Sequence, residues 1–205
     1  MTGKATLPRS ALTPPPSSDD AARLARPLTS QLIAEVDAEQ AAHEERLNHP
    51  AALAAAALWY ASHGIPVFPL AAGGKTPITR NGFKDATTDA DRVRAWWQKT
   101  PQANIGSPTG IRSDVIDVDG PKGYASLAGL EAAGFAPNVL AYARTPRGIH
   151  LHVAVSGGGN TTNWYPGIDI RGRGGYVVMP PSRAGDGRAW RWAAPPVLLA
   201  QAVTA

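Results

Sequence analysis

The stretch VIDVDGPKG, residues Val115–Gly123, places two carboxylates, Asp117 and Asp119, one residue apart at the end of a short apolar run. Side chains alternate between the two faces of a β-strand, so these carboxylates are expected on one face, about 7 Å apart along the strand. Two unpaired like charges this close repel each other unless a cation or solvent screens them. The pair therefore indicates either half of a metal site or a turn, since Asp before Gly-Pro is also a common turn device.

The segments around this stretch predict a mixed domain, because apolar residues recur at helical spacing in some of them and as short strand-like runs in others. Pro50 and Gly64 bound a first helix, and Thr88 is expected to cap a second. Trp96 and Trp97 are expected to pack in the core. This order favours an α/β or α+β domain over a long parallel Rossmann sheet. Helices are expected over 50–64, 87–101 and 124–135, strands over 65–70, 113–119, 139–144, 149–155, 167–172 and 175–182, and a Gly-containing loop over 104–110.

The N-terminal part of the chain has a different composition. Residues 1–29 are rich in Pro, Ser, Ala and Arg, and such a segment cannot bury enough apolar surface to order itself. A polar segment with helical spacing follows from Ser30 and indicates a solvated helix. The sequence thus predicts a flexible tail and polar helical extension over residues 1–50, and one folded domain over residues 51–205.

Composition narrows the classes of function. The 205 residues include no cysteine, which excludes disulfides, iron–sulfur clusters and thiolate zinc sites. Any metal must therefore be held by oxygen or imidazole. The net charge of +4 and the isoelectric point near 9.6 suit a polyanionic partner such as nucleic acid or a nucleoside triphosphate. With neither an apolar run of membrane-spanning length nor a signal-peptide core, we expect a cytoplasmic protein without a membrane partner.

Two further segments could join the acidic pair. In TPRGIHLHV, His150 and His152 alternate onto one strand face, and in GIDIRGRGG, Asp169 and Arg171 do the same. Carboxylates with an imidazole and a guanidinium suit metal-dependent nucleotidyl transfer, in which divalent ions activate a hydroxyl and stabilise the leaving pyrophosphate. Imidazole and guanidinium can also hold a triphosphate. Strand alternation alone does not separate the two histidines, and either can be a core residue.

Two familiar ligand-binding motifs are incomplete. The segment AGGKTP around Lys75 lacks the spacing of a Walker P-loop. A calcium-binding EF-hand loop fails because Pro121 and Lys122 stand where an acidic or amide residue and glycine are required.

A series of motifs, taken in order, resembles the bifunctional primase/polymerase N-terminal domain of the archaeo-eukaryotic primase superfamily, found in replication proteins of phages, plasmids and mobile elements. The resemblance extends from about Ala54 to Trp192. It implies an α+β fold in which an α/β N-terminal unit precedes an RRM-like catalytic sheet, so residues 51–205 would form the catalytic domain. The motifs are YASHGIPVFPL, GKTP, GFKDATTD, AWW, ANIGSPTG, VIDVDG, TPRGIHLHV, GIDIRGRGGYVVMPPS and GRAWRW.

The same resemblance implies a set of site residues. Asp117 and Asp119 match the acidic metal pair of the family, and Asp169 matches its third metal-binding carboxylate, which together would hold Mg²⁺ or Mn²⁺. His150 matches the nucleotide-binding histidine of the small-x-His motif. The residues that the resemblance implies at the triphosphate are Arg171 and Lys75.

The activity implied is transfer of nucleotides from (d)NTPs to a 3′-hydroxyl, on a single-stranded DNA template with a primer. Related proteins often continue into a helicase domain, whereas this chain ends at Ala205. Either a separate replicative helicase as a partner, or excision of this domain from a longer protein, would account for that difference.

Three alternatives compete with this interpretation. VIDVDG also looks like the nucleophile motif of haloacid-dehalogenase-like phosphatases, but Pro121 stands where that family has threonine. A D-x-D glycosyltransferase has no other support in the chain. A catalytically idle nucleic-acid-binding module fits the basic balance and the N-terminal tail. Retention of three carboxylates and His150 argues against it, because clustered like charges are costly without a role.

Overall fold

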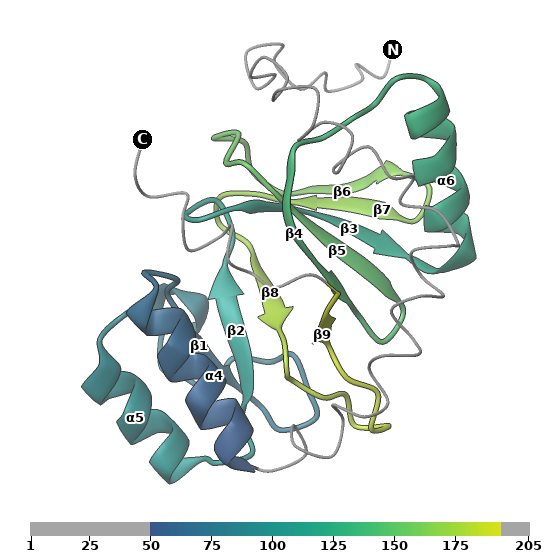
Figure 1. The fold of residues 1–205 in the computed structure, drawn as a ribbon. Helices are drawn as coiled ribbons and strands as arrows, with labels where there is room; N and C mark the ends of the chain where they lie inside the picture. Colours follow the sequence, from purple (N-terminus) through teal and green to yellow (C-terminus); the bar gives the residue numbers. More distant parts are fainter. Residues whose placement is uncertain (1–49, 194–205) are drawn as a thin grey trace, which may run out of the picture. The chain divides into compact units, whose positions relative to one another are not determined.

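The computed structural model describes residues 50–193, so the tail and polar extension expected over residues 1–49 lie outside the described residues. Three α-helices and one 3₁₀ helix, η2, accompany nine strands in this part of the chain. Figure 1 shows their arrangement. The elements are α4 (Pro50–Ser62), β1 (Phe68–Leu70), η2 (Gly82–Asp85), α5 (Ala90–Lys99), β2 (Asn104–Pro108), β3 (Asp114–Asp119), α6 (Gly120–Ala132), β4 (Val139–Arg144), β5 (Gly148–Val153), β6 (Thr161–Tyr165), β7 (Ile168–Arg171), β8 (Tyr176–Met179) and β9 (Arg191–Trp192).

The strands form two antiparallel sheets. The smaller sheet has the order β1-β2-β8, and the larger has the order β6-β7-β3-β5-β4-β9. Every pairing between these strands is antiparallel. The expectation of a mixed α and β domain, rather than a long parallel sheet, is therefore confirmed.

The two faces of the larger sheet have different roles. Alternation along β3 directs Ile116 and Val118 to one face, where they pack with Leu151 and Ile168 of neighbouring strands and with Leu127 of α6. Helix α6 covers this face, as Figure 1 shows. The opposite face carries the intervening residues of β3, including both carboxylates of the VIDVDG stretch.

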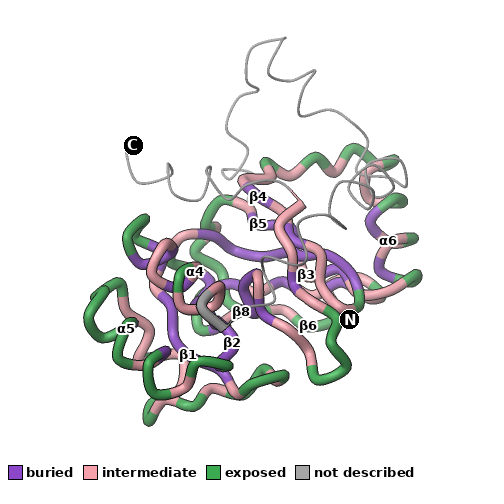
Figure 2. The backbone as a smooth tube through the Cα atoms, turned by 60° about the horizontal axis from the view of Figure 1, so that its bottom comes forward, coloured by how far each residue is buried: buried purple, intermediate pink, exposed green. Residues whose placement is uncertain are grey.

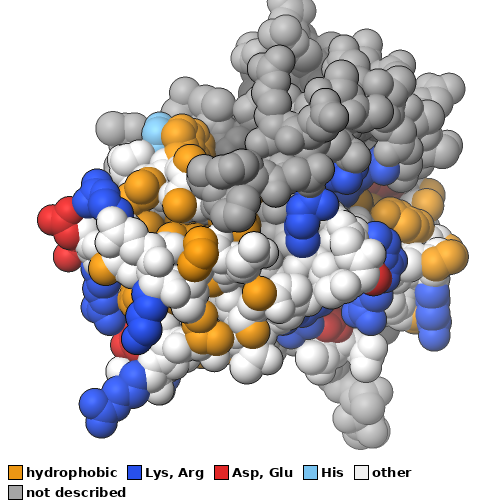
Figure 3. Space-filling model, turned by 90° about the horizontal axis from the view of Figure 1, so that it is seen from below, with side chains coloured by type: hydrophobic (Ala, Val, Ile, Leu, Met, Phe, Trp, Pro, Cys, Tyr) orange, Lys and Arg blue, Asp and Glu red, His pale blue; other side chains and the backbone are white. Residues whose placement is uncertain are grey.

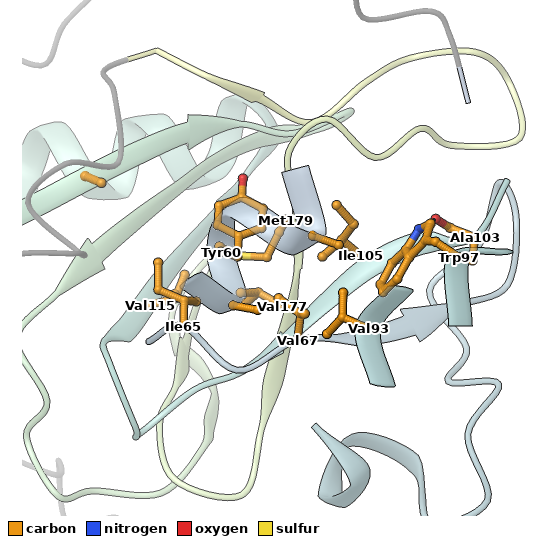
Figure 4. Packing of buried hydrophobic residues seen from close by; sticks show 13 residues of the cluster. Tyr60, Ile65, Val67, Val93, Trp97, Ala103, Ile105, Val115, Val177 and Met179 are labelled. Atoms are coloured by element: carbon orange, nitrogen blue, oxygen red, sulfur yellow. The ribbon is translucent and has the colours of Figure 1, made fainter. Parts of the chain in front are cut away.

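The smaller sheet packs against α4 and α5, which lie side by side (Figure 1). Val93 and Trp97, one helical turn apart, bury the inner side of α5. The Trp97 indole also donates a 3.0 Å hydrogen bond to the Ala103 carbonyl. Figure 4 shows these residues packed with Ile105 of β2 and Tyr60 of α4. Burial of such side chains stabilises each by roughly 1.5–3 kcal/mol before the entropic cost of ordering them.

Tyr60 connects α4 to both sheets. Its hydroxyl donates a 2.7 Å hydrogen bond to the Pro180 carbonyl, just beyond β8, and accepts one of 2.7 Å from the Trp192 indole of β9. Both bonds are made by a side chain that is almost fully buried. The helix, the smaller sheet and the edge of the larger sheet are thereby held in one packed unit.

The expected loop over 104–110 is wrong, because its first five residues form β2, the central strand of the smaller sheet. All five are buried, as the tube in Figure 2 shows for this strand. The strand needs Gly106, since a Cβ there would lie 2.5 Å from the Phe68 ring. The segment NIGSP is buried on both faces and has few large apolar residues. Its residues therefore do not alternate in polarity, and the sequence does not mark it as a strand.

The expected N-cap of α5 is also wrong. Asp89, and not Thr88, caps this helix, because the Asp89 carboxylate accepts hydrogen bonds from the amides of Asp91 and Arg92. Of the two tryptophans, Trp97 is buried as expected. Trp96 also packs against the core but is half-buried, and the Arg92 guanidinium lies over its ring, 4.9 Å from the centroid.

The remaining helices and strands were predicted close to their observed positions, except that η2 and the short edge strands β6 and β9 were not anticipated. Among the described residues, no helix is long and apolar enough to cross a membrane.

Candidate functional site

Three polar side chains lie in a row across the middle of the larger sheet. In the register of the strands, Asp117 of β3 is paired with Asp169 of β7 on one side and with His150 of β5 on the other. Directly paired residues share a sheet face. The structure therefore brings together three of the residues that the sequence singled out, from segments up to 52 positions apart along the chain.

Arg171 joins this row from the next same-face position of β7. Its guanidinium lies 2.7 Å from an Asp169 carboxylate oxygen and 3.7 Å from an Asp117 oxygen. The His150 Nε2 atom lies 3.5 Å from the other Asp117 oxygen, which is too long for a good hydrogen bond. Asp117 thus has only partial compensation for its negative charge.

The protonation of Asp117 reflects this position. Its side chain is 17% exposed, and burial, followed by the negative charge of Asp119, raises the pKa of Asp117 to about 6. Arg171 and Lys75 oppose this rise without cancelling it. An incompletely neutralised carboxylate of this kind favours the approach of a cation.

The two histidines of β5 have different surroundings. His150 borders the site, and burial, with neighbouring positive groups, holds its pKa well below the usual value, so the ring is neutral near pH 7. Its Nδ1 atom has no hydrogen-bond partner within residues 50–193. His152 instead packs against the Trp192 ring and has its Nδ1 atom 3.0 Å from the Ser113 hydroxyl. Burial lowers the pKa of His152 to about 3.

A pocket of about 230 Å³ opens between the two sheets beside this row. It contains both carboxylates of the VIDVDG stretch and His150, together with Lys75. Asp169 and Arg171, on the neighbouring strand β7, do not line it. Figure 3 shows one face of the molecule on which Lys and Arg side chains surround a few acidic ones. The lining residues are Lys75, Asp117, Asp119, Thr145, Pro146, Arg147, His150, Ala184, Arg188 and Trp190.

Arg147 reaches the pocket from the turn between β4 and β5. The Thr145 hydroxyl accepts hydrogen bonds from the amides of Arg147 and Gly148 and fixes this turn. The Arg147 guanidinium then lies 2.5 Å from an Asp119 oxygen, although its side chain is 64% exposed. Nothing in the sequence singled out Arg147, because the pairing of β3 with β5 decides which carboxylate an arginine in this turn contacts.

The other side of the pocket comes from the loops that follow β1 and β8. The Lys75 ammonium lies 5.5 Å from the ring centroid of Trp190, within the range of a cation–π interaction. Trp190 is 2% exposed, and its indole nitrogen has no hydrogen-bond partner among the described residues. Arg188 pairs with Asp186 and donates to the Pro146 carbonyl across the pocket. Arg188 and Trp190 occur in the GRAWRW motif, and no residue of this motif was predicted to belong to the site.

The acidic residues have the chemistry of a site for a hard divalent cation. Carboxylate oxygens are the ligands that Mg²⁺ and Mn²⁺ prefer, and the raised pKa of Asp117 indicates unsatisfied negative potential. Within residues 50–193, however, no three His, Asp or Glu side chains converge closely enough to hold an ion. Arg171 and Arg147 instead pair with Asp169 and Asp119. The carboxylate oxygens thus suit a divalent cation by type, whereas an assembled metal site is not seen among the described residues.

Carboxylates suit divalent cations, and arginine and lysine side chains suit phosphate groups. The chain matches the family model described as bifunctional DNA primase/polymerase, N-terminal, over residues 57–204. The match spans well over half of the sequence, so the chain belongs to this family, as its motifs indicated. Family membership indicates a primase/polymerase-type nucleotidyltransferase, a class that binds DNA and nucleotides. No individual curated protein matches the chain.

Proposed function

We propose that this protein is a DNA-dependent primase/polymerase that transfers nucleotides from (d)NTPs to a 3′-hydroxyl and releases pyrophosphate. The observation that carries the proposal is the row formed by Asp169, Asp117 and His150 beside a pocket with several cationic side chains. Family membership supplies the reaction class, and the row supplies the groups that this reaction needs.

Asp117, Asp119 and Asp169 are the proposed ligands of Mg²⁺ or Mn²⁺. A bound divalent cation would favour ionisation of the attacking hydroxyl and neutralise charge on the leaving pyrophosphate. In the absence of substrate, Arg147 and Arg171 satisfy two of these carboxylates. We expect Arg147 to leave Asp119 for a phosphate of the incoming nucleotide, because its side chain is largely exposed and free to move.

His150 and the pocket cations are the proposed contacts for the nucleotide. Because the ring of His150 is neutral, it can donate one hydrogen bond to a phosphate or sugar oxygen without adding charge. Lys75, Arg147 and Arg188 supply positive charge for the triphosphate. Arg171 faces Asp169 and Asp117, so its proposed role moves from the triphosphate to orienting those two carboxylates.

The volume of the pocket suggests which part of the substrate it takes. At about 230 Å³ it is smaller than the roughly 300–1,000 Å³ of sites that enclose a drug-sized ligand. We therefore expect the triphosphate to enter the pocket, with the sugar and base outside, next to the template strand.

The wider setting follows from the motif resemblance and is part of the same proposal. The six-stranded sheet would be the RRM-like catalytic sheet of the archaeo-eukaryotic primase fold. The protein would act in the cytoplasm on single-stranded DNA with a primer, during replication of a phage, plasmid or mobile element. A separate helicase would supply the template strand.

The test is incorporation of labelled dNTPs and NTPs on a single-stranded template, with and without primer, in Mg²⁺ or Mn²⁺. We expect metal-dependent products from the wild type and none from the Asp117→Ala/Asp119→Ala variant. Asp91→Ala is the matched control, because it removes an exposed carboxylate of α5 that also pairs with an arginine. Products that persist in the double variant would overturn the proposal.

A second candidate is a catalytically idle DNA-binding module of the same family. One observation favours it: Arg147 and Arg171 already neutralise two of the three carboxylates. Such a module would bind DNA equally well in chelator and in Mn²⁺ and would give no product under any condition. Family membership leaves the phosphatase and glycosyltransferase alternatives without support.

A further inference from the structure

Two loops leave the smaller sheet at the same end. The first, the Lys75 loop, comprises residues 71–76 and follows β1, and the second, the Arg188 loop, comprises residues 183–189 and follows β8. Leu70, at the end of β1, is paired with Asn104, and Met179, at the end of β8, is paired with Ile105. The first residue of the central strand β2 therefore lies between the two loops.

Asn104 is hydrogen-bonded to both loops at once. Its side-chain amide nitrogen donates to the Gly74 carbonyl at 2.9 Å and to the Arg183 carbonyl at 2.6 Å. Its side-chain oxygen accepts from the Arg183 amide at 2.9 Å. The residue is 1% exposed. Only a carboxamide both donates and accepts in this way, so neither Asp nor an apolar residue can replace it.

The backbones of the two loops also meet directly. Gly73 has φ +67°, and a Cβ at this position would lie 3.1 Å from the Cα atom of Gly185 in the other loop. The Tyr176 hydroxyl further donates a 3.0 Å hydrogen bond to the Lys75 carbonyl. The two loops are thus in contact at Gly73 and Gly185, next to the hydrogen bonds from Asn104, and the Tyr176 bond holds the Lys75 loop to β8.

This junction matters because each loop carries part of the pocket wall. The Lys75 side chain comes from one loop, whereas Arg188 comes from the other and Trp190 directly follows it. A triphosphate that contacts both cations needs a fixed distance between them. Long cationic side chains on exposed loops do not provide that distance by themselves, since ordering them has an entropic cost.

We propose that Asn104 is a positioning residue, which joins the Lys75 and Arg188 loops into one rigid wall for the triphosphate of the incoming nucleotide. The identity of the ligand rests on the proposed primase/polymerase function. The joining of the two loops does not depend on that function, because it is argued from the hydrogen bonds of Asn104 and from the close approach of Gly73 to Gly185.

The test compares Asn104→Ala with Ser107→Ala in the full-length protein. Ser107 is the matched control, because it lies on the same strand and donates one buried hydrogen bond, to the Pro66 carbonyl, away from the pocket. The first readout is hydrogen–deuterium exchange of the backbone amides. In Asn104→Ala we expect amides of both loops to exchange about tenfold faster, while those of the 145–148 turn change little.

The second readout is binding of dATP, and separately of inorganic tripolyphosphate, in Mg²⁺, together with steady-state incorporation. For Asn104→Ala we expect both dissociation constants and the KM for dATP to rise about tenfold, with kcat changed less than about threefold. Ser107→Ala should keep wild-type values. Unchanged exchange in the two loops of Asn104→Ala, or faster exchange with unchanged tripolyphosphate binding, would overturn the inference.

A second variant covers the case in which Asn104→Ala does not fold. Gly73→Ala places a methyl group 3.1 Å from the Gly185 Cα atom, so one of the two loops must shift by a few tenths of an ångström. We expect this shift to weaken tripolyphosphate binding by up to about tenfold. Gly64→Ala is its control, because Gly64 has a similar φ of +70° and open space around it. Equal binding by the two glycine variants would contradict the inference.

The proposed function and this inference fail in different ways. A wild-type protein that binds tripolyphosphate but incorporates no nucleotide would refute the polymerase activity, yet a binding defect confined to Asn104→Ala and Gly73→Ala would still support the inference.

Discussion

At the scale of single residues, the ionised Asp117 carboxylate lowers the free energy of unfolding near neutral pH. Its pKa is raised from 3.8 to about 6, because burial and the Asp119 charge disfavour the ionised form. The folded protein therefore binds the proton more tightly than the unfolded chain. The resulting stabilisation is fully present below about pH 3.8 and is lost as the pH rises through about 6.

Substitution of Asp117 by Asn should therefore stabilise the metal-free protein at pH 7.5. We expect Asp117→Asn to raise the free energy of unfolding there by up to about 3 kcal/mol and to leave it nearly unchanged at pH 3.5. Urea denaturation in chelator at the two pH values measures this difference. A loss of stability at pH 7.5 would mean that Asp117 is compensated in the folded state.

Substitutions of the two histidines of β5 should have different effects, one on nucleotide incorporation and the other on stability. We expect His150→Asn to reduce kcat/KM for dNTPs at least about a hundredfold with little change in the free energy of unfolding, because His150 lines the pocket. His152→Asn should instead lower the free energy of unfolding by about 1–3 kcal/mol, since His152 packs on Trp192 and contacts Ser113. Steady-state kinetics and urea denaturation of both variants test this assignment. Similar kinetic losses in the two would refute it.

At the scale of single elements, the turn between β4 and β5 presents Arg147 to Asp119. We expect Arg147→Ala to have opposite effects on the binding of metal and of nucleotide. Mn²⁺ should bind more tightly without nucleotide, whereas the KM for dNTPs should rise. The reason is that Asp119 loses a competing cation while the triphosphate loses a contact. Calorimetric titration with Mn²⁺ and steady-state kinetics measure the two effects.

Arg94→Ala provides the control for that turn, because Arg94 forms an exposed ion pair of the same length with Asp91 on α5. It should alter neither quantity, and stability should change by less than about 1 kcal/mol, as is usual for exposed pairs. Weaker Mn²⁺ binding by Arg147→Ala would contradict the proposed competition.

The elements also show how far the sequence could predict this structure. β3, β5 and β7 were predictable, because their residues alternate in polarity and the polar positions lie two apart. Within each strand, alternation grouped Asp117 with Asp119, His150 with His152 and Asp169 with Arg171. The common face of the three strands depends on how they pair. β2 was not predictable, since its burial depends on β1 and β8 flanking it and on the Phe68 ring covering Gly106.

Residues of the pocket that come from loops could not be predicted in the same way. Arg147, Arg188 and Trp190 lie near the carboxylates only because the two sheets pack together and the chain turns where it does. No local pattern encodes that residues about 70 positions apart, such as Asp119 and Arg188, line one pocket. The motifs that contain these residues supported the resemblance to the family, but no role was predicted for their side chains.

At the scale of the whole described unit, Tyr60 joins α4 to both sheets. We expect Tyr60→Phe to lower the free energy of unfolding by about 1–3 kcal/mol, because two buried hydrogen bonds are removed together. The KM for dNTPs should stay within about twofold of wild type, since the hydroxyl does not line the pocket. Ser62→Ala, which removes an exposed hydrogen bond of the same helix, is the control for urea denaturation.

The central claim is that carboxylates on neighbouring strands act as one catalytic centre. The most direct test is single-turnover incorporation on a primed template in Mn²⁺ by Asp117→Asn, Asp169→Asn and the double variant. We predict that each single substitution lowers the rate at least about a hundredfold, and that the double variant is little slower than either, as expected for groups that act as a unit. A rate for Asp169→Asn close to that of wild type would contradict the account.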